Sequence, residues 1–227
     1  MCVIAYIPKE SNGIEYKDFK NMWETNPDGA GIMWIDDDGD VFFKKGYFDM
    51  FELYKDYCII KHDYNFECAL HFRIRTSGNV DSKMCHPFIM TNKDKIITKT
   101  HGRVDTLVMH NGMINIKPHR KDFSDTAEYI ERNLYPMYKK DKRFFLHYTK
   151  RRKAEIENEI GFGSKLLIFC KDGVEMVGRW QKFKDYYCSN TYFDRSWNYY
   201  NYKENDKKNY WDFWDDNKKQ FVGCYYD

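Results

Sequence analysis

The sequence predicts an α+β domain built mainly from short strands. Short apolar runs bounded by Gly, Pro, Asn or Asp recur along the chain, as strands between turns do. Two pairs of such runs flank Asp38-Gly39 and Asp172-Gly173, a pattern typical of β-hairpins. Helical spacing of apolar residues occurs in only a few segments. Hydrophobic residues make up 42% of the 227 positions, which is enough to fill a core.

The first part of the chain alternates strands with two helices. Residues 16–25 have helical spacing, with Phe19 and Met22 on one face, and Asn26-Pro27 ends that helix. The acidic segment 36–40 lacks the full spacing and the closing glutamate of a calcium loop, so we expect a turn there. In order, the expected elements are a strand over 2–7, a helix over 16–25, a hairpin of 29–35 and 41–45, a helix over 49–58 and a strand over 67–75.

The strand expected over 67–75 alternates in character. His71, Arg73 and Arg75 point to one face, whereas Phe72 and Ile74 point to the other. On its own, an arginine on a strand is most often a solvated or paired charge.

The second part of the chain begins with strands over 106–110 and 113–116, which flank Asn111-Gly112 as in a hairpin. Ser124-Asp125 opens a helix running to about residue 133, and Asp125 with Glu128 has the spacing of a capping box. A basic helix over 142–159 and a hairpin of 165–170 with 174–180 follow.

Composition excludes several classes of protein. Lys+Arg 37 against Asp+Glu 35 gives a net charge of +2, so no strong field attracts nucleic acid or a membrane. No apolar run approaches the length of a membrane helix, and no export signal is evident. We therefore expect a cytoplasmic protein. The Lys/Asn/Tyr/Asp bias hints at an AT-rich genome, and for a phage-encoded protein the compartment would be the bacterial host cytoplasm.

The seven cysteines are scattered and form no C-x-x-C pair, which argues against a disulfide framework and a zinc knuckle. No phosphate-binding loop or nucleotide fingerprint is present. We expect free thiols, no metal and no cofactor.

Cys2 differs from the other cysteines by its position. If Met1 is removed, Cys2 carries a free α-amine, whose pKa near 8 allows it to accept the thiol proton. One residue would then supply both nucleophile and base. A retained Met1 abolishes this chemistry, and the simplest alternative is that Cys2 merely begins a strand.

Six short motifs stand in order along the chain: Met1-Cys2, Asn26-Pro-Asp-Gly-Ala-Gly31, His71-Phe-Arg-Ile-Arg-Thr-Ser-Gly78, His86-Pro-Phe88, His110-Asn-Gly112 and Ser124-Asp-Thr126. With these motifs in this order, about residues 1 to 192 resemble the class II (N-terminal nucleophile) glutamine amidotransferases. A Ser189-Asn190 pair also resembles the closing motif of small stand-alone bacterial and phage members.

The resemblance implies a four-layer αββα sandwich that hydrolyses the side-chain amide of glutamine or a related γ-glutamyl amide. Cys2 would be the nucleophile, and Asn111 and Gly112 would stabilise the oxyanion. The substrate-binding residues would be Arg73, which pairs with the α-carboxylate, Thr76, and Asp125, which holds the α-ammonium group. The glycine-rich segment 28–31 would shape a strand packed beside the nucleophile.

Two departures from the family pattern bear on specificity. Arg75 replaces a small residue and Ser77 replaces a common histidine. Arg75 could change the pocket, or it could pair with Glu24 or Asp28.

The chain shows no sign of the synthase domain that would use the released ammonia, so the acceptor would lie on a separate synthase partner or the reaction would be plain amide hydrolysis. The alternative is a catalytically silent amidotransferase-like fold that acts as a binding or structural module.

Residues 193–227 form a second segment, an aromatic and polar tail that packs as an arm or is disordered. The basic stretch 139–153 and the tail aromatics raise a third hypothesis, nucleic-acid association. Acidic residues between the aromatic rings argue against it, so no nucleic-acid or membrane partner is expected.

Overall fold

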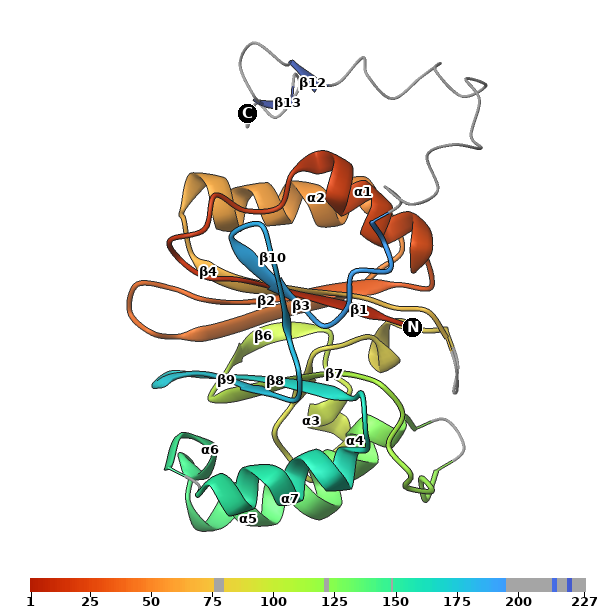
Figure 1. The fold of residues 1–227 in the computed structure, drawn as a ribbon, viewed down its shortest axis with the longest axis vertical. Coiled ribbons are helices and arrows are strands. Elements are labelled where there is room, and N and C mark those ends of the chain that lie inside the picture. Colours follow the sequence, from red (N-terminus) through yellow and green to blue (C-terminus); the bar gives the residue numbers. More distant parts are fainter. Residues whose placement is uncertain (76–79, 121–122, 148, 195–213, 216–219, 222–227) are drawn as a thin grey trace. The chain divides into compact units, whose positions relative to one another are not determined.

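Two antiparallel β-sheets form the framework of residues 1–194 (Figure 1). The computed structural model describes residues 1–75, 80–120, 123–147, 149–194, 214–215 and 220–221. The chain divides into two units, residues 1–194 and 195–227. In the second unit, the short strands β12 (Trp214–Asp215) and β13 (Gln220–Phe221) pair antiparallel. Apart from Phe193 and Asp194, which belong to the first unit, the remainder of the predicted aromatic tail lies outside the described residues, and the expected boundary after residue 192 stays a prediction.

The larger sheet has seven strands in the order β10-β11-β1-β4-β2-β3-β6. Strands β1 and β2 both pair antiparallel with β4, which lies between them. The glycine-rich segment 28–31 leads into β2, and β4 separates this strand from β1, which follows Cys2. The strands are β1 (Val3–Ile7), β2 (Ala30–Ile35), β3 (Val41–Tyr47), β4 (Glu67–Phe72), β6 (His101–Val104), β10 (Gln181–Phe183) and β11 (Tyr186–Cys188).

The smaller sheet has four strands in the order β5-β7-β8-β9. Its central strands, β7 and β8, are paired over six residues and are almost entirely buried. The strands are β5 (Phe88–Ile89), β7 (Thr106–Asn111), β8 (Lys165–Cys170) and β9 (Gly173–Val177).

Helices lie on the outer sides of the two sheets in Figure 1. On the side of the larger sheet are α1 (Tyr16–Thr25) and α2 (Met50–Cys58), and a π-helical turn over Ile59–Asp63 extends α2. The other helices are α3 (Asp94–Ile97), α4 (Asp125–Tyr129), α5 (Tyr135–Lys140), α6 (Phe144–His147) and α7 (Lys150–Ile160), with a π-helical stretch over Ile130–Leu134 joining α4 to α5. None of the helices in the described part of the chain is long and apolar enough to cross a membrane.

Apolar side chains fill the spaces between these layers. Between the sheets, Ile4, Leu107 and Phe169 belong to one buried cluster. A second cluster packs β7 and β8 against the helices that follow residue 124. Under α1 and α2, the ring of Phe19 meets that of Phe72 at 5.2 Å, which anchors α1 on β4.

Several predicted elements are confirmed. The helix over 16–25 has the expected bounds, and the hairpins of β2 with β3 and of β8 with β9 are present. In the acidic turn between β2 and β3, the Asp36 carboxylate accepts the backbone N–H groups of Asp38 at 3.0 Å and Asp40 at 2.8 Å, as in a turn stabilised by its own side chain.

Two predicted strands differ from the structure. The strand expected over 67–75 ends at Phe72, because the backbone of Arg73 pairs with Gly29 and Asp28, and the Asp28 carboxylate then accepts the N–H of Arg75 at 2.8 Å. The expected strand over 113–116 is absent, and the chain runs there as a loop that buries Ile114.

The helical predictions also need correction. Ser124, not Asp125, is the N-cap of α4, since its side chain accepts the N–H of Ala127 at 3.1 Å. The helix extends through the π-helical stretch to Lys140, beyond the expected end near residue 133. The basic helix expected over 142–159 is divided into α6 and α7, and the Thr149 side chain caps α7.

Candidate active site

Cys2 stands immediately before β1, at the end of the strand where Val3 pairs with Phe72 of β4. Its thiol sulfur lies 3.4 Å from both the carbonyl oxygen and the amide nitrogen of Ile74. The residue is half-buried. Strand pairing thus places the thiol beside the segment that leaves β4.

Arg73 occupies the same segment and is 6% exposed. Burial raises the pKa of the Cys2 thiol, while the hydrogen bond from Ile74, the positive chain terminus and the charge of Arg73 lower it. Arg73 is therefore close enough to favour the thiolate, which is the reactive form of cysteine.

Asn111 and Gly112 terminate β7 in the smaller sheet. Asn111 is buried, and its side-chain nitrogen donates to the hydroxyl of Ser189 at 2.7 Å. Gly112 has a φ of +146°, and a Cβ built there would lie 2.7 Å from the Cβ of Ser164. Only glycine fits this approach. The expected Asn-Gly hairpin turn is not formed, because the chain after Gly112 enters a loop.

Ser189 and Asn190 connect these groups. The Ser189 hydroxyl also accepts the N–H of Ile4 at 2.8 Å, and the side chain of Asn190 donates to the carbonyl of Cys2 at 2.8 Å. Both residues are buried. Their contacts link the start of β1, next to Cys2, to Asn111 at the end of β7.

Asp125 begins α4 and faces the loop that follows Gly112. Its carboxylate accepts the N–H of Ile114 at 2.8 Å and that of Thr126 at 2.8 Å. The negative charge of Asp125 also raises the pKa of His110, although burial lowers that pKa by more. The structure thus joins Asp125 to the Asn111-Gly112 segment through the backbone. Thr76, the remaining predicted substrate-binding residue, lies outside the described residues, as does Ser77.

Three buried imidazoles lie near the end of β7: His71 and His86 stack on each other, whereas His110 projects from β7 toward α4, where its Nδ1 lies 3.0 Å from the hydroxyl of Thr126. The rings of His71 and His86 stack at 4.2 Å, and Nε2 of His71 lies 3.2 Å from the carbonyl oxygen of His110. Burial lowers the pKa of His71 to about 3 and that of His110 to about 4, and it lowers the pKa of His86 as well. All three are neutral at neutral pH.

Nearby, burial lowers the pKa of Lys45 to about 7, and its amine donates to the carbonyl of Lys83 at 2.9 Å. Within the described ranges, no group of three or more His, Cys, Asp or Glu residues is arranged to hold a metal ion. The described cysteines are free thiols.

Arg75 is exposed, and its backbone N–H donates to the Asp28 carboxylate at 2.8 Å. Of the two acids considered as its partner, Asp28 is the one that it contacts, through the main chain. The side chain of Arg75 therefore remains on the surface near the candidate site.

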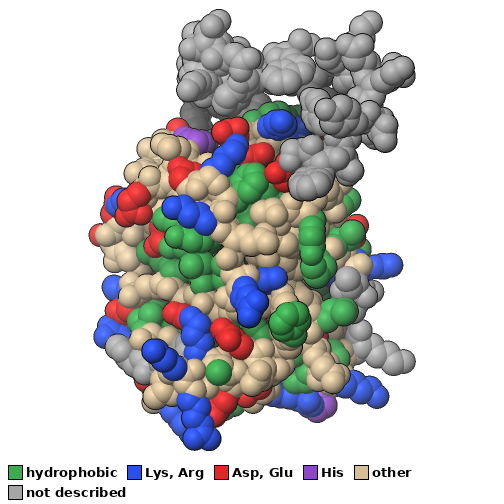
Figure 2. Space-filling model, in the orientation of Figure 1, with side chains coloured by type: hydrophobic (Ala, Val, Ile, Leu, Met, Phe, Trp, Pro, Cys, Tyr) green, Lys and Arg blue, Asp and Glu red, His purple; other side chains and the backbone are tan. Residues whose placement is uncertain are grey.

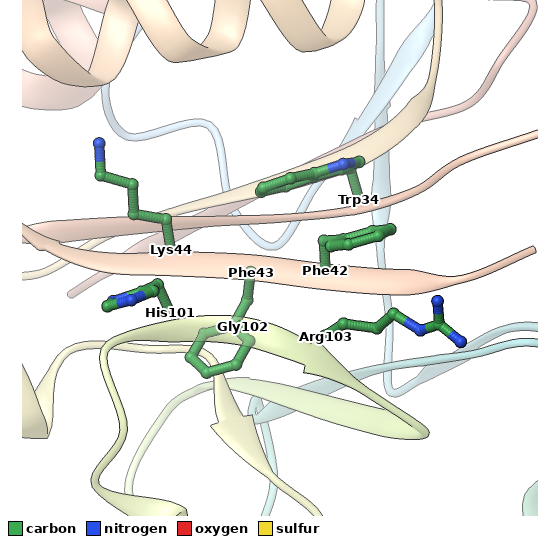
Figure 3. A pocket seen from close by; sticks show the side chains of 7 residues that line it. All are labelled: Trp34, Phe42, Phe43, Lys44, His101, Gly102 and Arg103. Carbon is green, nitrogen blue, oxygen red and sulfur yellow. The ribbon is translucent and has the colours of Figure 1, made fainter.

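A surface pocket of about 460 Å³ lies elsewhere, along β2, β3 and β6 (Figure 3). The rings of Trp34 and Phe42 stack at 5.5 Å on one of its walls. None of the predicted site residues lines it. Its lining residues are Trp34, Phe42, Phe43, Lys44, His101, Gly102 and Arg103.

Sequence reasoning found Cys2, Arg73, Asn111, Gly112 and Asp125 but assigned no role to Ser189 or Asn190. The signal in the sequence was the resemblance of this pair, late in the chain, to the closing motif of small stand-alone family members. Their contacts with the site become evident only once β11 is paired with β1.

Comparison with known proteins gives limited information. No protein-family model matches the sequence, and no curated protein matches it. Among solved structures, the chain is similar to glutamine phosphoribosylpyrophosphate (PRPP) amidotransferase from B. subtilis, determined in complex with ADP and GMP, with a TM-score of 0.48 and 14% sequence identity. The match covers 83% of this chain and 41% of that chain, so this chain spans about two fifths of its length.

Proposed function

We propose that the chain hydrolyses the side-chain amide of glutamine, or of a related γ-glutamyl amide, and releases ammonia for a separate acceptor. The observation that carries this proposal is the link that Ser189 and Asn190 make between Asn111 and the start of β1 at Cys2, together with the effect of the Arg73 charge on the Cys2 thiol. A thiol, a cation and an amide donor suit attack on an amide whose substrate carries a carboxylate.

The proposed reaction begins once Met1 has been removed. Met1 is 58% exposed, which leaves it accessible to an aminopeptidase. The free α-amine of Cys2 accepts the thiol proton through water, and the sulfur bonds to the amide carbon. The carbon–nitrogen bond then breaks, the amine proton passes to the leaving nitrogen, and ammonia departs from a thioester. Water hydrolyses that thioester to glutamate and restores the thiol.

The tetrahedral intermediate needs donors that are in place before the reaction. The side-chain amide of Asn111 and the N–H of Gly112 would supply them. Asn111 is held by Ser189, and Gly112 is held by its close approach to Ser164, so both donors are restrained.

The substrate would be recognised through its two charged ends. The guanidinium of Arg73 matches the fork geometry of an α-carboxylate, with Thr76 beside it. The carboxylate of Asp125 would bind the α-ammonium group. Each carboxylate oxygen has two lone pairs, so the bonds from Ile114 and Thr126 leave acceptor capacity for a substrate.

The fold and the surface fit this proposal. The sequence of layers in Figure 1, helices outside two antiparallel sheets, supports a four-layer αββα sandwich of the N-terminal nucleophile hydrolase type. Figure 2 shows acidic and basic side chains interspersed on the visible face, which fits a small-molecule substrate better than a nucleic acid. We propose a cytoplasmic enzyme that needs no cofactor and works with a separate synthase partner.

The alternative is a catalytically silent amidotransferase-like module. Burial raises the pKa of the Cys2 thiol, and a retained Met1 would block its amine. Intact-protein mass spectrometry of material from the native source distinguishes the two proposals, because the catalytic chain must begin at Cys2.

Turnover tests the function directly. Purified protein incubated with glutamine should release glutamate and ammonia in equal amounts, and the Cys2→Ala variant should release neither. The Cys58→Ala variant, which removes another half-buried thiol, is the matched control and should remain active. Absence of Cys2-dependent turnover, with candidate synthases also present, would contradict the proposal.

A further inference from the structure

The hydroxyl of Ser189 receives two hydrogen bonds, one from the larger sheet and one from the smaller sheet. Asn111 donates through its side-chain nitrogen at 2.7 Å, and Ile4 donates through its backbone at 2.8 Å. Ser189 is 1% exposed, and its own N–H donates to the carbonyl of Ile4 at 2.9 Å. The two hydrogen bonds with the backbone of Ile4 fix the position of Ser189, so its hydroxyl can hold the side chain of Asn111.

The two donors come from different sheets. Ile4 is in β1, two residues after Cys2, whereas Asn111 ends β7. A single oxygen atom therefore couples the strand of the proposed nucleophile to the strand of the proposed oxyanion donor. The next residue, Asn190, binds the carbonyl of Cys2, so the same turn also restrains the nucleophile's backbone.

The geometry of an amide explains why this contact matters. The side-chain nitrogen of asparagine carries two N–H groups in the plane of the amide. When one of them points at Ser189, both that plane and the direction of the second N–H are determined. An amide without such a partner can rotate or flip, and it then presents oxygen instead of nitrogen. Preorganisation of the donor is what makes an oxyanion site effective.

We infer that Ser189 is a positioning residue for the amide hydrolysis: its hydroxyl orients the Asn111 side chain so that the free N–H faces the developing oxyanion. This inference rests on the proposed function. Ser189 touches neither the substrate nor the reacting atoms, and it acts through Asn111.

The Ser189→Ala variant tests the inference through its effect on kcat and KM. Removal of an oxyanion donor lowers kcat by about 10²–10³-fold. Loss of its orientation should cost less, about tenfold or more in kcat, with KM within about twofold, because the interaction forms only in the transition state. Ser189→Thr, which keeps the hydroxyl, should recover part of the loss.

Two controls separate positioning from simple destabilisation. Ser11→Ala removes another buried hydroxyl, one that accepts the N–H of Gly13 at 3.0 Å beyond the opposite end of β1. It should lower stability without changing kcat. Alkylation of Cys2 by iodoacetamide needs no oxyanion donor, so its rate in Ser189→Ala should equal that of the wild type.

A double-mutant cycle decides the outcome. If Ser189 acts through Asn111, the kcat of Ser189→Ala/Asn111→Ala should equal that of Asn111→Ala alone. If the two losses multiply, or if iodoacetamide labelling falls as far as turnover does, the inference is wrong although glutamine turnover by the wild type stands. If the wild type itself shows no turnover, the proposed function fails, and this inference fails with it.

Discussion

The sulfur of Cys2 lies 3.4 Å from both the carbonyl oxygen and the amide nitrogen of Ile74. This contact continues the pairing of β1 with β4 one step beyond Val3 and Phe72. It sets the thiol next to Arg73, whose charge favours the thiolate against the effect of burial. The juxtaposition of a nucleophile and a cation thus follows from the register of two strands.

Replacement of Arg73 by glutamine should make the Cys2 thiol harder to ionise. Burial raises the pKa of this thiol and the charge of Arg73 lowers it, so removal of the charge should raise the pKa further. The pH dependence of iodoacetamide labelling at Cys2 measures this, and the curve should move to higher pH. Arg103→Gln is the control, since Arg103 pairs with Asp40 on the edge strand β6. An unchanged curve for Arg73→Gln would contradict the assigned proximity.

Replacement of Gly112 by alanine should reduce both stability and activity. The new Cβ would lie 2.7 Å from Cβ and 2.9 Å from Cα of Ser164, so β7 and the 161–164 turn must separate. Overpacking of this kind costs about 1–3 kcal/mol. Urea denaturation measures the loss, and glutamine turnover should fall as the Gly112 N–H is displaced.

Gly163→Ala is the matched control for that experiment. Gly163 also has a positive φ, +84°, but a Cβ there meets nothing within 4 Å. Its substitution carries the backbone cost without the clash. Equal effects of the two substitutions on turnover would argue against a special role for Gly112.

His71 should make the protein sensitive to acid. Burial lowers its folded pKa to about 3, with a further contribution from the charge of Arg73, against an unfolded value near 6.5. Between these values the unfolded chain binds the additional proton, so stability is complete above pH 6.5 and is lost as pH falls toward 3. Chemical denaturation at pH 6 and at pH 4 measures the loss in the free energy of unfolding between the two pH values. This loss should be smaller for His71→Gln than for the wild type, by up to about 1.4 kcal/mol per pH unit. Equal losses would mean that His71 titrates normally.

Substitution of Asp125 by asparagine should weaken recognition of the substrate's α-ammonium group. Truncating one partner of a buried charge pair costs about 2–5 kcal/mol, so KM for glutamine should rise at least about tenfold. Discrimination against N-acetylglutamine, which lacks the positive charge, should fall in parallel. Ser124→Ala is the control: it removes the cap of α4 and about 1 kcal/mol of stability, and it should leave KM unchanged. If Asp125→Asn still discriminates as the wild type does, the ammonium group is bound elsewhere.

Local pattern predicted the elements whose side chains alternate between core and solvent. The helix over 16–25 was predicted correctly because Phe19 and Met22 share a buried face. The strand expected over 113–116 was wrong, because its apolar residues divide between a buried Ile114 and an exposed Met113 in a loop bound to Asp125. Periodicity alone does not distinguish these cases.

The candidate site was predictable as a set of residues but not as an arrangement. Motif order pointed to Cys2, Arg73 and Asn111. The contacts that link them, however, depend on the pairing of β1 with β4 and on Ser189 and Asn190, which follow β11. The helix cap was misassigned to Asp125 because Ser124 and Asp125 are both good caps, and backbone geometry selects between them. The Ser189-Asn190 pair was noted as a motif, but its contact with Asn111 was not predicted, since periodicity and turn patterns do not reveal a contact across 78 positions.

The central claim is that a free N-terminal Cys2 attacks a glutamine amide. Its most direct test is mass spectrometry of the intact protein after reaction with a glutamine analogue that carries a diazoketone in place of the amide. The account predicts a chain that begins at Cys2 and bears one adduct on that residue, blocked by excess glutamine. A chain that retains Met1, an adduct on another cysteine, or no adduct at all would contradict it.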